Sequence, residues 1–183
     1  MSAAVQYAFA MPMEPSYAEE DFLVSASNED AYRLATTPSL AVGIIAISGP
    51  KGAGKTHLAH IYARRYDTRF VAADELGRLT ADRILGHAAA LVIENVETIR
   101  ADEALAQLIN EVHARGRRML LTSGVVLSGF QPERPDLASR LRAAHEVVIR
   151  APDDTLMQAL LVKGFADRQV RVGEEVVSYL ARR

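Results

Sequence analysis

The sequence predicts an α/β fold built on a doubly wound parallel sheet of five strands, and three observations lead to this prediction. Short apolar runs alternate with segments whose apolar residues recur at helical spacing, as in chains of βα units. The longer runs are apolar almost without interruption, which is typical of strands covered by helices on both faces. A glycine-rich loop, GPKGAGKT at 49–56, follows the first run and precedes a helical segment. Strand, loop and helix in this order form a phosphate-binding loop, or P-loop.

Each element is bounded by turn or capping signals. Strands are expected at 40–48, 69–72, 88–93, 119–123 and 146–149. A first helix is expected after 27–30, which resembles a capping box, and its apolar stripe is Ala31, Leu34 and Ala35. Further helices are expected at 56–65, 80–85, 102–115 and 135–141. Since strands and helices alternate along the chain, the strands are expected to be parallel.

Three segments are expected along the chain. Residues 1–14 form an extended arm, 15–151 the α/β nucleotide-binding domain, and 152–183 a short helical lid. Asp153 and Asp154 are placed to cap the first lid helix, and a second helix is expected near 174–183. The apolar residues expected to point inward are Leu156, Leu160, Leu161 and Phe165 in the first lid helix, and Val176, Val177 and Leu180 in the second.

Composition excludes several classes of protein. The 183 residues contain no cysteine, which excludes disulfides and thiolate metal sites and suits a reducing cytoplasm, the location we expect. No apolar run approaches the roughly 18 residues needed to span a membrane. The net charge of −2 does not favour binding of nucleic acid through a broad positively charged surface. We therefore expect neither membrane insertion nor extensive direct nucleic-acid binding.

The P-loop carries the clearest chemistry. Its residues are Gly49, Pro50, Lys51, Gly52, Ala53, Gly54, Lys55 and Thr56. Glycines at 49, 52 and 54 let backbone N–H groups curl around phosphate oxygens, and the following helix adds its positive end. Lys55 is expected to reach the β- and γ-phosphates, and Thr56 to supply a ligand to Mg²⁺.

A second motif, ALVIENVE at 90–97, resembles a Walker B segment, in which a buried strand ends in an acidic residue. Glu94 is expected to bind Mg²⁺ together with Thr56. The next position, where a carboxylate usually orients the attacking water, is Asn95, and an amide cannot act as a base. Glu97 could substitute for this carboxylate, but it is expected to point elsewhere if the strand geometry continues. The sequence therefore predicts slow hydrolysis.

Two further patterns have both a functional and a structural interpretation. Thr122 and Ser123 end the strand expected beside the Walker B strand, where polar residues face the γ-phosphate in related sites or simply end a strand. Arg140 lies in the stretch RPDLASRL at 134–141, and an arginine at the edge of one molecule can act in a neighbour's ATP site. An ordinary solvated arginine is the alternative.

Together these motifs resemble the AAA+ domain of the DnaA/Hda family of replication initiators and their short regulatory paralogues. The resemblance covers nearly the whole chain and is stronger to the short regulatory members, which also tend to lack a full acidic pair. It implies that Arg140 is an arginine finger acting in trans. It also implies an N-linker that packs on adenine, formed by Phe22, Leu23, Val24 and Asn28. In departure from the family, Gly124 replaces an acid, and no sensor 2 arginine follows in the short lid.

The N-terminal peptide QYAFAM at 6–11 resembles the peptide by which the regulatory members bind the DNA polymerase sliding clamp. Gln6 would fix its register, while Tyr7, Phe9 and Met11 would enter an apolar groove. The peptide departs from the usual Gln-Leu-x-Leu form, because Tyr7 and Phe9 stand in the leucine positions. A flexible apolar tail is the alternative interpretation.

The resemblance implies a regulator that binds ADP or ATP with Mg²⁺ and, together with the sliding clamp, promotes hydrolysis of DnaA-bound ATP. A self-sufficient P-loop ATPase or phosphotransferase is the first alternative, because the P-loop and Glu94 are intact. A DNA-binding initiator or loader is the second, and the acidic charge and the lack of space for a DNA-binding insert disfavour it. The sequence leaves open whether the protein forms a homodimer.

Overall fold

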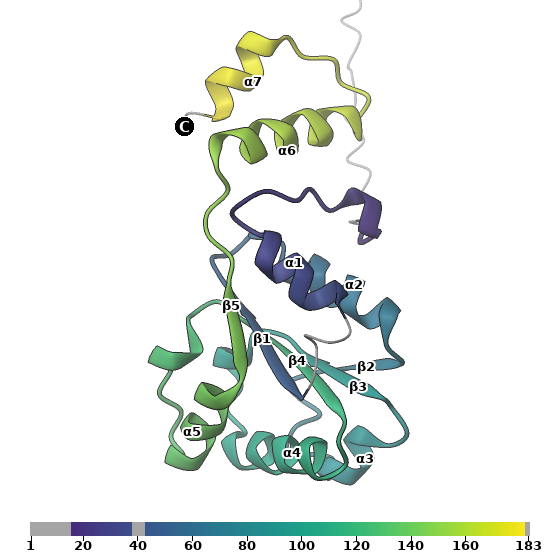
Figure 1. The fold of residues 1–183 in the computed structure, drawn as a ribbon, viewed down its shortest axis with the longest axis vertical. Coiled ribbons are helices and arrows are strands. Elements are labelled where there is room, and N and C mark those ends of the chain that lie inside the picture. Colours follow the sequence, from purple (N-terminus) through teal and green to yellow (C-terminus); the bar gives the residue numbers. More distant parts are fainter. Residues whose placement is uncertain (1–15, 38–42, 182–183) are drawn as a thin grey trace, which may run out of the picture.

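The core of the fold is a sheet of five strands that are all parallel and lie in the order β2-β3-β4-β1-β5 (Figure 1). The computed structural model describes residues 16–37 and 43–181. The strands are β1 (Ile44–Ser48), β2 (Thr68–Val71), β3 (Ala90–Ile93), β4 (Arg118–Ser123) and β5 (His145–Val148). This confirms the predicted fold class and all five strands. The start of the first predicted strand, 40–42, falls outside the described residues.

Helices cover both faces of this sheet. They are α1 (Glu29–Thr36), α2 (Lys55–Arg65), α3 (Ala81–Leu85), α4 (Asp102–Ala114) and α5 (Pro135–Ala143). One core layer joins the sheet to α1 and α2, and the other joins it to α3, α4 and α5. Within β1, Ile45 and Ile47 belong to the first layer and Ala46 to the second, since successive side chains of a strand alternate between faces. Burial on both faces explains why these strands are continuously apolar.

Two helices, α6 (Asp154–Ala166) and α7 (Glu174–Ala181), lie beyond the carboxyl ends of the strands and pack against each other (Figure 1). The side chain of Asp153 caps α6 by accepting a hydrogen bond from the backbone N–H of Leu156 at 2.7 Å, as predicted. No helix in the described part of the chain is both long and apolar enough to cross a membrane.

The predicted inward face of these lid helices is wrong for three of its seven residues, and two more, Leu161 and Phe165, are only half-buried. Only Leu156 is buried in α6, and only Val177 is buried in α7. Leu160, Val176 and Leu180 are each at least 40% exposed. The periodicity identified the helices correctly, but a helix buries a whole apolar face only where a neighbouring layer covers it. Within the described residues, α6 and α7 pack mainly against each other.

Candidate functional site

The P-loop connects the carboxyl end of β1 to the first turn of α2, as the sequence predicted. It is tied to the sheet at its start, where the N–H of Gly49 donates to the carbonyl of Ser123 on β4 at 3.1 Å. Gly52 and Gly54 have φ angles of 83° and 91°, a left-handed conformation that favours glycine. Gly54 is the N-cap of α2, so the positive end of that helix faces the loop. This geometry suits the binding of phosphate groups.

Lys55 is folded back onto the loop. Its ammonium group donates to the carbonyl oxygens of Gly49 and Pro50 at 2.8 and 2.9 Å, and the residue is 8% exposed. Burial lowers the pKa of this ammonium group, and the nearby carboxylates of Glu97 and Glu94 oppose that shift. A buried cation among carbonyl dipoles is well placed to exchange those contacts for stronger bonds to phosphate oxygens.

The residues predicted to hold Mg²⁺ lie together. The hydroxyl of Thr56 donates to Oε1 of Glu94 at 2.6 Å, which joins the start of α2 to the end of β3. Mg²⁺ prefers oxygen ligands and commonly takes one or two protein oxygens, with phosphates and waters completing its shell. These two oxygens fit that preference, so Thr56 and Glu94 would hold the ion beside a bound nucleotide. Within the described residues, no group of three acidic or histidine side chains offers an alternative metal site.

Thr122 and Ser123, the polar residues expected either to face the γ-phosphate or simply to end a strand, stand at the end of β4, next to β3 as predicted. The hydroxyl of Thr122 accepts a hydrogen bond from the N–H of Asn95 at 3.1 Å, and it therefore joins the two strand ends. The hydroxyl of Ser123 is engaged with the backbone of Val125 and is fully buried. Of the two, Thr122 is the residue in direct contact with the Walker B segment.

The position of Glu97 differs from the prediction that this side chain points away. The strand ends at Ile93, Asn95 adopts a left-handed φ of 51°, and a 3₁₀ helix spans Val96–Thr98. The turn brings Glu97 back, so that its Oε1 accepts from the N–H of Gly124 at 2.8 Å. The available signal was Asn95 itself, because asparagine is among the few non-glycine residues that adopt this conformation readily.

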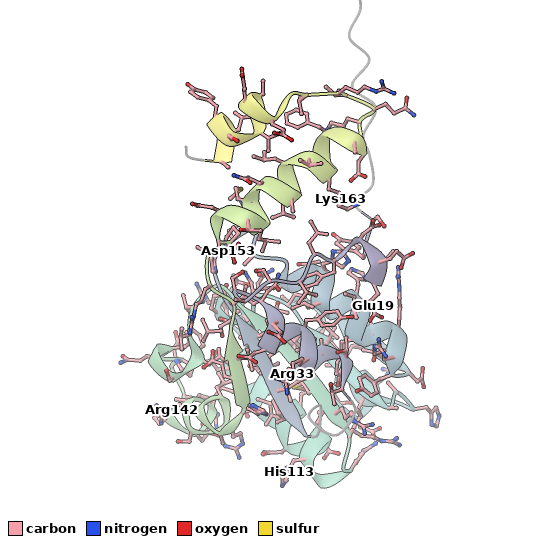
Figure 2. All side chains as sticks on the ribbon, turned by 45° about the horizontal axis from the view of Figure 1, so that its top comes forward. Glu19, Arg33, His113, Arg142, Asp153 and Lys163 are labelled. Atoms are coloured by element: carbon pink, nitrogen blue, oxygen red, sulfur yellow. The ribbon has the colours of Figure 1, made fainter. Side chains whose placement is uncertain are left out.

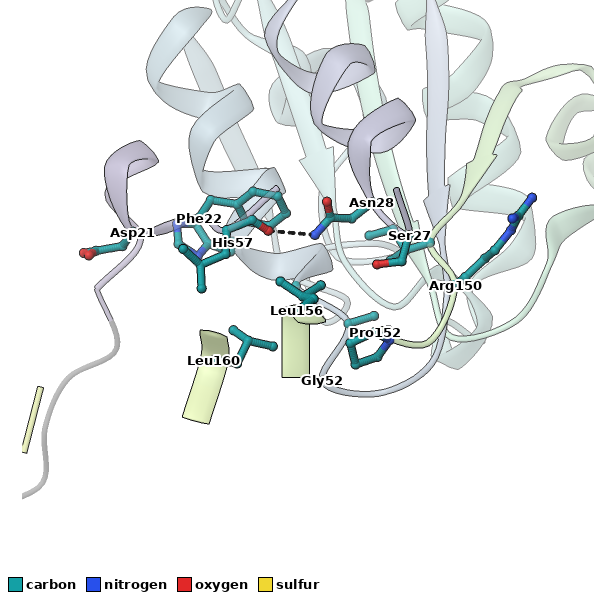
Figure 3. A pocket seen from close by; sticks show the side chains of 14 residues that line it. Asp21, Phe22, Ser27, Asn28, Gly52, His57, Arg150, Pro152, Leu156 and Leu160 are labelled. Atoms are coloured by element: carbon teal, nitrogen blue, oxygen red, sulfur yellow. Dashed lines mark hydrogen bonds between the residues drawn. The ribbon is translucent and has the colours of Figure 1, made fainter. Parts of the chain in front are cut away.

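A cavity beside the P-loop is enclosed by the N-terminal segment, the loop and the lid (Figure 3). Phe22, Leu23 and Asn28 line it together with Gly52, Ala53 and Gly54. Val24, assigned to the same group by resemblance, does not line it and is 47% exposed. The ring of Phe22 lies so close to the loop that a Cβ atom at position 54 would be 3.0 Å from its Cε2. An aromatic and apolar wall next to a phosphate loop suits a nucleobase.

The side chain of Asn28 is bonded to the backbone that carries this wall, and it does not cap α1. It occupies the N-cap position, but its side chain makes no capping bond. Its amide nitrogen donates to the carbonyl of Leu23 at 2.9 Å (Figure 3), and its Oδ1 accepts from the N–H of Ser25 at 2.8 Å. The capping box predicted at 27–30 is therefore wrong in its bonding: the N-cap is Asn28 rather than Ser27, and the hydroxyl of Ser27 is bonded to that of Ser25 in the preceding turn.

Replacement of Asn28 with alanine is expected to lower the free energy of unfolding by about 1–3 kcal/mol, because two backbone groups lose a nearly buried partner. Urea denaturation of the two proteins measures this difference. Asn28→Asp is the matched control, since it keeps an acceptor for Ser25 and loses only the donor to Leu23. An alanine variant with an unchanged denaturation midpoint would contradict this role.

The lid closes over the cavity from the opposite side. Leu156 and Leu160 of α6 line it. The ammonium group of Lys163, which is labelled on this helix in Figure 2, forms an ion pair with Asp21 at 2.7 Å. Lys163 holds the pKa of Asp21 below its usual range. This contact connects the lid to the N-terminal segment across the mouth of the cavity.

Arg140 lies at the amino ends of the strands, opposite the P-loop, which lies at their carboxyl ends. It lines a depression with Gly43 and Ile44 at the start of β1, whereas the P-loop follows the end of that strand. Its Nε donates to Oδ1 of Asn110 at 2.8 Å, and its Nη1 to the carbonyl of Asp136 at 3.1 Å. His113, from the same depression, lies at the far end of the domain from Asp153 in Figure 2. The predicted finger and the P-loop are therefore well separated.

The peptide containing Gln6, Tyr7, Phe9 and Met11 lies outside the described residues, so its predicted role stays a prediction.

In this parallel sheet the first strand leads through the loop into a helix, and an acidic residue follows β3, which is separated from β1 by β4. These features define a P-loop NTPase fold. The chain belongs to the AAA domain family, whose profile matches residues 44–183. No curated protein matches the sequence.

Solved structures show the same fold. Domain III of the replication initiation protein DnaA from Thermotoga maritima is 21% identical, with a TM-score of 0.78 over 93% of this chain and 82% of that one. AMPPCP-bound DnaA from Aquifex aeolicus is 20% identical, with a TM-score of 0.76 over 92% of this chain. The match spans only 60% of the Aquifex protein. The fold is thus the DnaA-like form of the AAA+ domain.

Proposed function

We propose that this protein is a nucleotide-binding regulator of replication initiation, which promotes hydrolysis of the ATP bound to a DnaA initiator by inserting Arg140 into that partner's site. The observation that carries the proposal is the distance of Arg140 from the protein's own P-loop. The two ends of β1, a strand of five residues, lie about 16 Å apart, at roughly 3.3 Å per extended residue. An arginine so placed is suited to the phosphates of another molecule.

The surroundings of Arg140 support this role. Asn110 and Asp136 bond its Nε and Nη1, and no hydrogen bond to its Nη2 occurs within the described part of the chain. A guanidinium group that is oriented by two neighbours loses less entropy when it binds a phosphate. The side chain is one third exposed, so a partner can reach it.

The protein's own nucleotide would be ADP or ATP with Mg²⁺. Lys55 would bind its phosphates, Thr56 and Glu94 its metal ion, and Phe22 would face its base. The AMPPCP bound to the similar DnaA supports an adenine nucleotide. The peptide at 6–11 would bind the sliding clamp and thereby bring the regulator to its partner; this step rests on sequence resemblance.

The test is a reconstitution with purified components. DnaA loaded with labelled ATP is mixed with the ADP-bound protein and the DNA-loaded clamp, and release of labelled phosphate is followed. We expect faster hydrolysis than with DnaA and clamp alone, and a weaker clamp dependence when Gln6 and Phe9 are both replaced by alanine. An intact protein that leaves the hydrolysis rate of DnaA unchanged would contradict the proposal.

A further inference from the structure

The Walker B segment has Asn95 where a second carboxylate is usual, and a carboxylate, Glu97, follows two residues later. The left-handed turn at Asn95 and the following 3₁₀ helix carry Glu97 to the end of β4. There Oε1 of Glu97 is fixed by the N–H of Gly124 at 2.8 Å. The position of this group is therefore set by the backbone of two adjacent strands.

The other oxygen, Oε2, is buried and has no hydrogen-bond partner among the described residues. A buried charged acceptor without a donor is costly, so this oxygen is suited to accept a hydrogen bond from a group that enters the site. The N–H of Gly49, the first residue of the P-loop, donates to the carbonyl of Ser123, the residue before Gly124. Glu97 is therefore held beside the start of the P-loop.

We infer that Glu97 holds and deprotonates the water that attacks the γ-phosphate of ATP bound at the protein's own P-loop, so that the protein converts bound ATP to ADP. The oxygen of that water forms a bond to the γ-phosphorus, and the bond from this phosphorus to the bridging oxygen breaks. The proton passes to Oε2 of Glu97 and then to solvent. The products are ADP, which keeps the bridging oxygen, and inorganic phosphate.

The other polar groups nearby do not fill this role. The amide of Asn95 cannot take up the proton. Glu94 already accepts the hydroxyl of Thr56 and is committed to the metal side of the site. Glu97 is the remaining carboxylate of the Walker B segment, and it is held beside the start of the P-loop. This inference rests on nucleotide binding in the proposed function but not on any action on a partner.

The first test compares the wild type with Glu97→Gln, which keeps the shape of the side chain and removes the base. Single-turnover hydrolysis is measured with γ-labelled ATP, Mg²⁺ and the full chain in excess, and ATP affinity is measured separately. We expect the rate to fall about 100-fold, the lower end of the effect of a general base, while the dissociation constant for ATP changes less than about twofold. Glu133→Gln, at an exposed glutamate, is the control and should keep the wild-type rate.

A second variant moves the carboxylate without removing it. A Cβ atom at position 124 would lie 2.7 Å from Oε1 of Glu97, the far end of a flexible side chain, so Gly124→Ala is expected to displace this group and leave the fold intact. Its single-turnover rate should fall about tenfold or more, and adding Glu97→Gln should then give no more than the loss from Glu97→Gln alone, because both changes act on one group.

The inference is overturned if the wild type shows no hydrolysis of its own ATP, or if Glu97→Gln keeps the wild-type rate. A rate loss that a higher concentration of the protein restores would also overturn it, because Glu97 would then act only in binding. Stimulation of DnaA by ADP-loaded Glu97→Gln is measured in parallel. If that stimulation persists while the hydrolysis data are negative, the further inference fails and the proposed function stands.

Discussion

Replacement of Lys55 with alanine is expected to remove the stabilisation of the protein by ADP and ATP. Each hydrogen bond from a charged group contributes about 1.5–3 kcal/mol, so losing two to phosphate oxygens weakens binding by about 100-fold or more. In the wild type, ligand at about 100 times its dissociation constant adds about 2.7 kcal/mol to the unfolding free energy, which raises the Tm by several degrees. The variant should show almost no such shift.

Thermal unfolding at increasing nucleotide concentration measures this difference. Arg64→Ala is the matched control, because it also removes a cation from α2 but lies at the exposed far end of the helix. The Tm without nucleotide shows whether each variant is folded. An undiminished ADP-dependent shift in the Lys55 variant would mean that the nucleotide binds elsewhere.

Replacement of Arg140 with alanine is expected to abolish the stimulation of DnaA-bound ATP hydrolysis. An arginine finger supplied in trans typically accelerates phosphoryl transfer about 10³–10⁵-fold, because it stabilises charge that develops in the transition state. The variant should retain ADP binding, since Arg140 lies near the start of β1 and the P-loop follows the end of that strand. Phosphate release in the reconstituted assay, with ADP binding measured alongside, separates these two effects.

Arg142→Ala is the control for this variant, because Arg142 is exposed on the same helix and carries the same charge. Its stimulation should stay within about twofold of the wild type, as expected for a solvated surface residue. Equal loss in both variants would point to general electrostatic attraction between the proteins. Full activity of the Arg140 variant would contradict the finger role.

The fold was predictable because the determining signals are local. Strands buried on both faces must be apolar at nearly every position, and each of the five runs ends at a turn or capping signal. The P-loop was equally predictable, since its glycines are required by the backbone path around phosphate. Small shifts remained at strand ends: β3 begins at Ala90 rather than at residue 88, because the N–H of Ala88 bonds to Leu85 in the turn after α3.

The parts that escaped prediction depend on tertiary structure. The exposure of Leu160 and Val176 could not follow from helical periodicity, which identifies an apolar face but not the layer that covers it. The bonding of Asn28 depends on a turn in the preceding chain rather than on the helix it begins. The return of Glu97 depends on a single left-handed residue, which changes the direction of the chain by an amount that strand geometry does not anticipate.

Direct calorimetric titration of the protein with ADP and with ATP, each with Mg²⁺, tests the central claim most directly. The claim is that an adenine nucleotide occupies the pocket between the P-loop, Phe22 and the lid. We predict saturable binding with one nucleotide per chain, which is lost in the Lys55→Ala variant. Absence of binding by the folded wild-type protein to either nucleotide would contradict the account.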